Sequence, residues 1–201
     1  MESRSLYDVI LAFAYGEGRQ MNDILASICI QQAGEEVPIV TQRDLAASIV
    51  EFSDKGRGMI SLSRKDGEKI EKFSQQHPEG RFYIESAELI VMHQEKYISS
   101  LDIIKRFLKV AQATGWKRVL IVAVPQHLPR CVKDFCRESK GYDIEDIIPY
   151  EHKDVRDNEI WYNKKDPQMW VRSPLIWKIR DAILSVLPWA LYKKIALQEE
   201  K

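Results

Sequence analysis

Residues 118–124, Arg118-Val119-Leu120-Ile121-Val122-Ala123-Val124, form a continuous aliphatic run in which β-branched residues predominate. Such a run is typical of a strand buried on both faces of a parallel sheet, because helices cover both faces of a sheet of that kind. Pro129 follows where the first turn of a helix would begin, and Gly141 lies where that helix would end. We therefore expect a strand followed directly by a helix.

Similar units occur elsewhere in the chain. Short apolar runs lie at 9–14, 37–41 and 88–92, each followed by apolar residues at helical spacing, and a last run lies at 144–149. Repeated strand–turn–helix units with short connections predict an α/β fold. The expected architecture is a doubly wound, mostly parallel, Rossmann-like sheet with a helical C-terminal extension.

The domain organisation follows from shifts in composition. We expect one α/β domain over residues 1–160, with a polar surface insertion at 53–80 that contains a short helix. Residues 161–201 are expected to form a tryptophan-rich helical extension packed on that domain. The clearest helix of the chain is predicted between Ser99, a suitable N-cap, and Gly115, a suitable C-cap.

Composition bounds the partners and the compartment. The chain has 201 residues, with 30 basic and 30 acidic side chains and a formal net charge of zero, so no bulk charge attracts nucleic acid. Three cysteines are too few for a disulfide framework, which favours a reducing compartment. The apolar run at 9–15 is much shorter than the roughly 18 residues of a membrane-spanning helix. We expect a cytoplasmic protein with no transmembrane segment and no nucleic-acid partner.

Ligands of doubly wound sheets bind beyond the carboxyl ends of the strands, so the residues at those ends are the candidates for a site. Gly16-Glu17-Gly18-Arg19 follow the first run. Glycines there let backbone N–H groups approach an anion at a helix N-terminus. The stretch lacks the third glycine of a dinucleotide fingerprint, and a simple tight turn explains it equally well.

His127 and Arg130 follow the run 118–124, and both can face the same crevice. A histidine there can hydrogen-bond or carry a proton near neutral pH, and the arginine offers a planar fork to a phosphate or carboxylate. The alternative is that His127 caps local backbone while Arg130 pairs with a surface acid. No histidine has a partner at metal-ligand spacing, so we predict no metal site. Hydrolysis or transfer at a phosphate ester therefore ranks below ligand binding.

Four of the five tryptophans lie after residue 160, namely Trp161, Trp170, Trp177 and Trp189. They can pack the tail onto the sheet, stack on a flat ligand or form a dimer surface, and packing is favoured. A helix is expected from Ser173-Pro174 to Pro188. Lysines and arginines in this segment also suit an interfacial membrane helix, which Asp181 disfavours because it interrupts the basic side.

Two motifs resemble the YdcF/SanA/ElyC-like family of bacterial domains of unknown function, over roughly residues 7–181. The strand 116–122 with His127 and Arg130 is similar to a family strand that ends in a Tyr-His-x-x-Arg turn, with Gln126 in place of the tyrosine. The stretch 170–173, Trp-Val-Arg-Ser, is similar to the family's Trp-x-Arg-Ser segment. Downstream of it, Trp177 and the pair Arg180-Asp181 follow, with aspartate for the usual glutamate.

A third match is poorer. The family usually has a glutamate after its third core strand and then an Asn-Thr-x-Glu-Asn helix start, and here Gln94, Ser99, Ser100, Asp102 and Ile103 occupy those positions. The glycine pair expected after the second strand is also absent. The chain therefore resembles a divergent member of the family.

The resemblance implies a crevice built from Gly16-Glu17-Gly18-Arg19, Ser99, Ser100, Asp102, His127 and Arg130. Its catalytic candidates are His127 and Asp102. The implied ligand is a small anionic or nucleotide-like molecule, such as S-adenosylmethionine or another adenine-containing cofactor, and the implied role is maintenance of the bacterial envelope. The alternative is a non-catalytic interaction module whose tryptophan-rich tail forms a homodimer or partner surface. Whether the chain is an enzyme stays open at this point.

Overall fold

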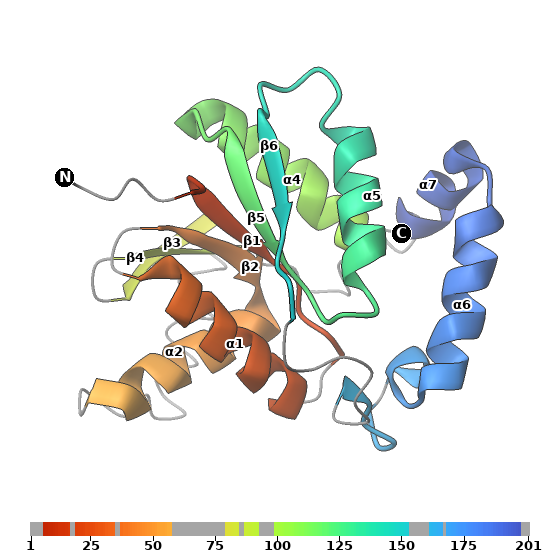
Figure 1. The fold of residues 1–201 in the computed structure, drawn as a ribbon, viewed down its shortest axis with the longest axis horizontal. Coiled ribbons are helices and arrows are strands. Elements are labelled where there is room, and N and C mark those ends of the chain that lie inside the picture. Colours follow the sequence, from red (N-terminus) through yellow and green to blue (C-terminus); the bar gives the residue numbers. More distant parts are fainter. Residues whose placement is uncertain are drawn as a thin grey trace.

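A computed structural model describes residues 6–16, 19–34, 37–57, 79–84, 87–92, 99–152, 161–166 and 168–197. Its sheet has six strands: β1 (Val9–Ala12), β2 (Ile39–Gln42), β3 (Glu79–Ile84), β4 (Ala87–Met92), β5 (Arg118–Val122) and β6 (Asp146–Pro149). The strand order is β3-β4-β2-β1-β5-β6, in which only β3 runs antiparallel to its neighbour. This arrangement, seen in Figure 1, confirms the predicted doubly wound, mostly parallel α/β sheet.

Helices cover both faces of the sheet. α1 (Arg19–Ala33) and α2 (Arg43–Arg57) lie on one face, and α4 (Ser100–Thr114) and α5 (Leu128–Glu138) lie on the other. The two-residue period of a strand sends alternate side chains to opposite faces. In β1, Ile10 packs with the α1 and α2 layer, whereas Leu11 packs with the α4 and α5 layer.

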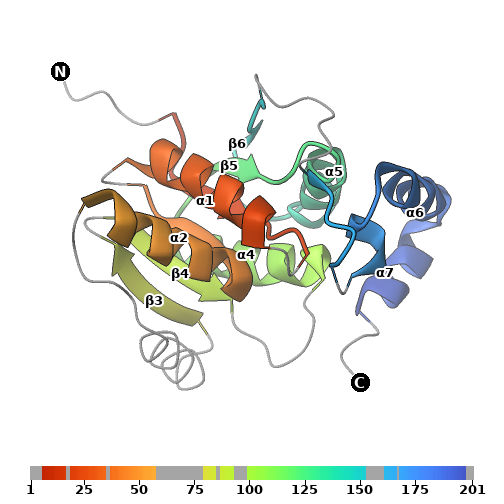
Figure 2. The same cartoon turned by 90° about the horizontal axis from the view of Figure 1, so that it is seen from below.

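In the described part of the C-terminal segment lie the 3-10 helix η2 (Met169–Val171), α6 (Pro174–Val186) and α7 (Trp189–Leu197). Figures 1 and 2 show α6 and α7 at one end of the molecule, beyond α5. The hydroxyl of Tyr192 in α7 donates to the Asp134 carboxylate in α5 at 2.6 Å. Within the described residues, no helix has the length and apolar character needed to cross a bilayer.

Two elements differ from the expectations. Strand β3 was not predicted; it pairs antiparallel with β4 at the edge of the sheet. Helix α7 was not predicted either, because Pro188 was interpreted only as the end of α6. Of the expected insertion at 53–80, residues 53–57 continue α2 and residues 79–80 begin β3. The remainder, 58–78, lies outside the described residues.

Asp8 ties together β1 and β5, which are far apart in the sequence. Its Oδ2 accepts the backbone N–H groups of Lys117 at 3.0 Å and Arg118 at 2.9 Å. Its Oδ1 accepts Nε of Arg118 at 3.1 Å and the terminal Nη2 at 2.6 Å. Partial burial alone would raise the pKa of Asp8, but the hydrogen bonds from Arg118 and the two amides outweigh burial and hold this pKa below its usual value.

The variant Asp8→Ala should lower the free energy of unfolding by about 2–3 kcal/mol at neutral pH, because it leaves charged and backbone donors without their acceptor. A carboxylate whose pKa is lower in the fold than in the unfolded chain stabilises the fold at pH values above its unfolded-state pKa. This stabilisation is lost as the pH falls through its folded-state pKa. The difference in unfolding free energy between the two proteins, measured with denaturant, should therefore begin to shrink below about pH 4 and shrink further as the pH falls through the lowered pKa of Asp8. A difference that stays constant with pH would show that the Asp8 charge is not involved.

Candidate functional site

The order of the strands reverses between β1 and β5, and the residues that follow these strands bound the candidate site. Gly16, after β1, has a positive φ of 66°. A Cβ atom at Gly16 would lie 2.6 Å from Oδ2 of Asp166 and 3.0 Å from Cγ2 of Val171. Glycine is therefore required by conformation and by the close approach of the C-terminal segment.

The indole of Trp177 packs against residues that follow β1 and β5. Its ring centroid lies 5.2 Å from that of Tyr15 and 5.4 Å from that of His127. The Arg130 guanidinium carbon lies 5.2 Å from the same indole, and the indole Nε1–H donates to the Gln126 carbonyl at 3.3 Å. Trp177 is 4% exposed and is the one buried residue of α6. The tail thus supplies the central side chain of the candidate site.

Ser100, His127 and Arg130 form a hydrogen-bonded row across α4 and α5. Nε2 of His127 lies 2.9 Å from the Ser100 hydroxyl oxygen, and Nδ1 lies 3.2 Å from Nη2 of Arg130. A guanidinium only donates hydrogen bonds, so Nδ1 of His127 is the acceptor. In the neutral ring the proton is then on Nε2, which donates to Ser100.

Electrostatics keep this imidazole neutral. Burial lowers the pKa of His127 well below its usual value, and the nearby charges of Arg130 and Arg180 lower this pKa further. A Ser–His dyad requires an unprotonated ring nitrogen facing the serine hydroxyl. The protonated Nε2 faces Ser100 here, so the row holds Ser100 in place and does not activate it as a nucleophile.

The guanidinium of Arg130 forms an ion pair through Nη1, whereas its Nε has no hydrogen-bond partner among the described residues. Its Nη1 donates to Oδ1 of Asp181 at 3.3 Å, so Asp181 lies on the side of α6 that faces α5. Its Nε is buried and has no hydrogen-bond partner among the described residues. The side-chain amide nitrogen and oxygen of Gln126 and the hydroxyl of Tyr15 are also buried without a hydrogen-bond partner in the described chain. Buried polar groups are nearly always paired, so these atoms are the unsatisfied polar groups of the candidate site.

Asp166 adds a carboxylate at the Gly16 turn. It is 1% exposed; its Oδ1 accepts the backbone N–H of Gln168 at 2.9 Å, and its Oδ2 has no partner in the described part of the chain. The pKa of the Tyr15 hydroxyl is raised by burial first, then by Tyr162 and Asp166, while Arg180 and Arg130 act in the opposite direction. The crevice therefore combines cationic and anionic groups around one buried phenol.

The remaining predicted site residues lie at two helix starts. Ser99 is the N-cap of α4 and accepts the backbone N–H of Asp102, as predicted, and its hydroxyl donates to the Asp102 carboxylate at 2.6 Å. This pair caps the helix, and neither side chain bonds to His127 in the described chain. Arg19 begins α1. Glu17 and Gly18 lie outside the described residues.

The structure thus brings together Ser100, His127 and Arg130 and surrounds them with groups that sequence reasoning did not assign to the site. These are Tyr15, Gln126, Asp166, Trp177 and Asp181. The sequence contained an indication for Trp177 and Gln126 as site residues, because both lie in the motifs that resemble the family. Asp166 had none. Among the described residues, no three His, Cys, Asp or Glu side chains are grouped so that they could hold a metal ion.

The variant His127→Gln should flatten the dependence of stability on pH. The fold holds His127 neutral, whereas the unfolded chain protonates it near pH 6.5, so stability falls as the pH drops below that value. Removal of this group should reduce the loss of unfolding free energy between pH 7.5 and 5.5 by about 1 kcal/mol. Urea denaturation of the wild-type chain and the variant at both pH values measures this loss of unfolding free energy. An unchanged pH dependence would mean that the fold does not lower the pKa of His127 below its value in the unfolded chain.

Comparison of the chain with protein-family models, with curated proteins and with solved structures found no match. The candidate site therefore stands on its own geometry.

Proposed function

We propose that the chain binds a small anionic, nucleotide-like ligand in the crevice beyond β1 and β5. The observation that carries the proposal is that the Nε of Arg130 and the side-chain amide of Gln126 are buried and have no hydrogen-bond partner among the described residues. An unsatisfied buried donor costs about 1–3 kcal/mol, more for a charged group, and a ligand acceptor removes that cost. A phosphate or carboxylate oxygen is the acceptor that suits a guanidinium best.

The backbone supports an anion at the same edge of the sheet. Helices α1, α4 and α5 each follow a parallel strand, so their N-termini point to the carboxyl edge of the sheet. The free N–H groups and the dipole of a helix N-terminus favour negative charge. Asp166 at the Gly16 turn opposes an anion there, so we assign the anionic group of the ligand to Arg130 and a hydroxyl donor, such as one on a ribose, to Asp166.

In the structure, the indole of Trp177 blocks a ligand from reaching the candidate site. Its indole occupies the space between Tyr15, His127 and Arg130, so a ligand reaches these groups only when α6 shifts. Because Trp177 is the one buried residue of α6, such a shift breaks few apolar contacts. The displaced indole would offer an aromatic face on which an adenine ring, as in S-adenosylmethionine, could stack.

In this proposal the role of His127 is positional. A neutral imidazole that accepts from Arg130 and donates to Ser100 holds both side chains at the crevice. The catalytic roles predicted for His127 and Asp102 stay predictions. The resemblance to the YdcF/SanA/ElyC-like family supports the same choice of ligand, and with it we propose a cytoplasmic protein with a role in maintenance of the bacterial envelope.

The test is a thermal-shift screen with nucleotides, S-adenosylmethionine, sugar nucleotides and phosphorylated metabolites. A ligand that binds only the folded state, at a hundred times its Kd, adds about 2.7 kcal/mol of stability. The variant Arg130→Met retains an apolar stem and loses every donor, so the shift should disappear. Arg137→Met is the matched control, because Arg137 is an exposed arginine on the same helix that stacks on Trp189.

A shift that Arg130→Met retains in full would remove Arg130 from the site. A shift that both variants lose would indicate a general effect of charge on α5 and would also contradict the proposal.

A further inference from the structure

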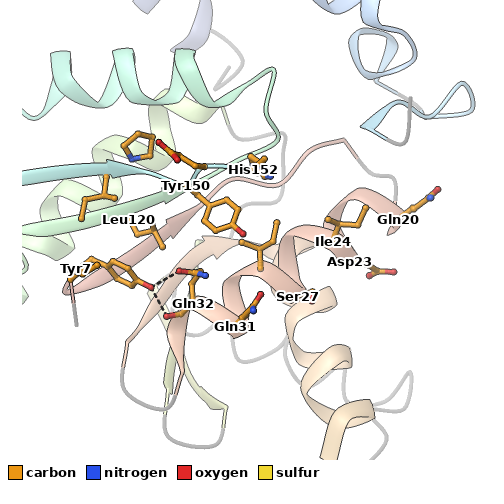
Figure 3. Close-up of a pocket in the computed structure, with 15 residues that line it drawn as sticks. Tyr7, Gln20, Asp23, Ile24, Ser27, Gln31, Gln32, Leu120, Tyr150 and His152 are labelled. Atoms are coloured by element: carbon orange, nitrogen blue, oxygen red, sulfur yellow. Dashed lines mark hydrogen bonds between the residues drawn. The ribbon is translucent and has the colours of Figure 1, made fainter. Parts of the chain in front are cut away.

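A wide groove lies between the outer side of α1 and strands β5 and β6, with a volume of about 1310 Å³ (Figure 3). Helices α1 and α2 cover the β1 and β2 part of this face, and the groove lies over the β5 and β6 part. Its sheet side includes Leu120, Ile148 and Tyr150, and its helix side includes Ile24 and Ile28. The groove is therefore a partly apolar surface of the sheet that remains open.

The groove is acidic. Among the lining residues that the structure describes, the charged groups are Asp23 and Glu151, and none is a lysine or arginine. His152 also lines it, but burial lowers the pKa of His152, although the hydrogen bond with the Ala123 carbonyl, at 2.7 Å from Nε2, partly opposes this effect. At neutral pH the described lining of the groove therefore has a net negative charge.

A second apolar surface lies on α6, on the side away from Trp177. Leu175, Ile179, Ile183 and Val186 are 68%, 53%, 56% and 79% exposed. Steps of four, four and three residues place them in one stripe along the helix. Large exposed apolar stripes of this kind mark interaction surfaces.

The stripe and the groove complement each other in length. The groove follows α1 from Gln20 to Gln32, which is about 18 Å at the helical rise. The stripe runs from Leu175 to Val186, which is about 17 Å. A helix that fits a groove of equal length can present successive turns to its apolar lining.

The two surfaces also complement each other in charge. Residues 168–197 contain five basic residues and one acidic residue. The acidic residue is Asp181, which pairs with Arg130, while Lys178 is exposed beside the stripe. Stripe-to-stripe pairing of two copies would bring like charges together, whereas the groove offers carboxylates.

We propose that α6 of one copy of this chain docks its Leu175–Val186 stripe into the α1–β6 groove of a second copy. The contact joins two different surfaces. When each copy places its α6 stripe in the groove of the other, the two copies form a closed dimer with two such contacts. The proposal does not depend on the ligand in the crevice, since its interface uses the opposite side of α6.

The test is sedimentation velocity of the full chain over a hundredfold range of concentration. The wild-type chain should associate. A stripe variant, Ile179→Glu with Ile183→Glu, and a groove variant, Ile24→Lys, should each raise the dimer Kd at least tenfold. Ile195→Glu is the control, because Ile195 is an exposed apolar residue of α7 outside the stripe. Asp23→Lys, a surface change in the groove, tests the same side should Ile24→Lys not fold.

Mixing gives the decisive result. The stripe variant retains its groove and the groove variant retains its stripe, so an equal mixture should form a heterodimer although neither variant associates alone. Failure of the mixture to associate would overturn the proposal. A groove variant that still dimerises alone would assign the contact to stripe-to-stripe pairing and would overturn it as well. A wild-type chain that stays monomeric would also overturn it. In that case, stripe-dependent pelleting of the monomer with vesicles of anionic phospholipid would assign the stripe to a membrane surface.

Discussion

The contact of Trp177 with the ends of β1 and β5 is the interaction on which the candidate site depends. Those two strands are neighbours in the sheet, and the strand order reverses between them, which is where ligands bind in sheets of this kind. One indole touches Tyr15 from the first strand end and His127 from the second. It also holds α6 on the domain, because α6 has no other buried residue. The same side chain therefore closes the crevice and orients the apolar stripe of α6 outward.

The chemistry of the crevice favours binding over proton transfer. His127 lies next to a serine, which in isolation suggests a catalytic dyad, but Arg130 decides the direction of the hydrogen bonds because its guanidinium can only donate. Burial and two nearby arginines keep the ring neutral. Nε of Arg130 and the Gln126 amide are buried without a hydrogen-bond partner among the described residues, and in the proposed function they recognise the ligand.

The strands β1, β2 and β5 could be predicted because both of their faces are buried, so that each is a short aliphatic run that ends at turn-forming residues. Strand β3 at the edge has no such run and pairs antiparallel, and it was missed. For the site, the rule that ligands bind at strand ends led to His127 and Arg130 from local position alone. The contacts of Trp177 and Asp166 with those ends join residues far apart in the chain, and no local pattern specifies them.

The central claim is that Arg130 fixes His127 as a neutral acceptor at the crevice. The most direct measurement is the long-range ¹H–¹⁵N NMR spectrum of the imidazole at neutral pH, with His127 assigned by substitution. The account predicts a neutral ring with the proton on Nε2 and an unprotonated Nδ1. A proton on Nδ1, or a doubly protonated ring, would contradict it, because Nδ1 could not then accept from the Arg130 guanidinium.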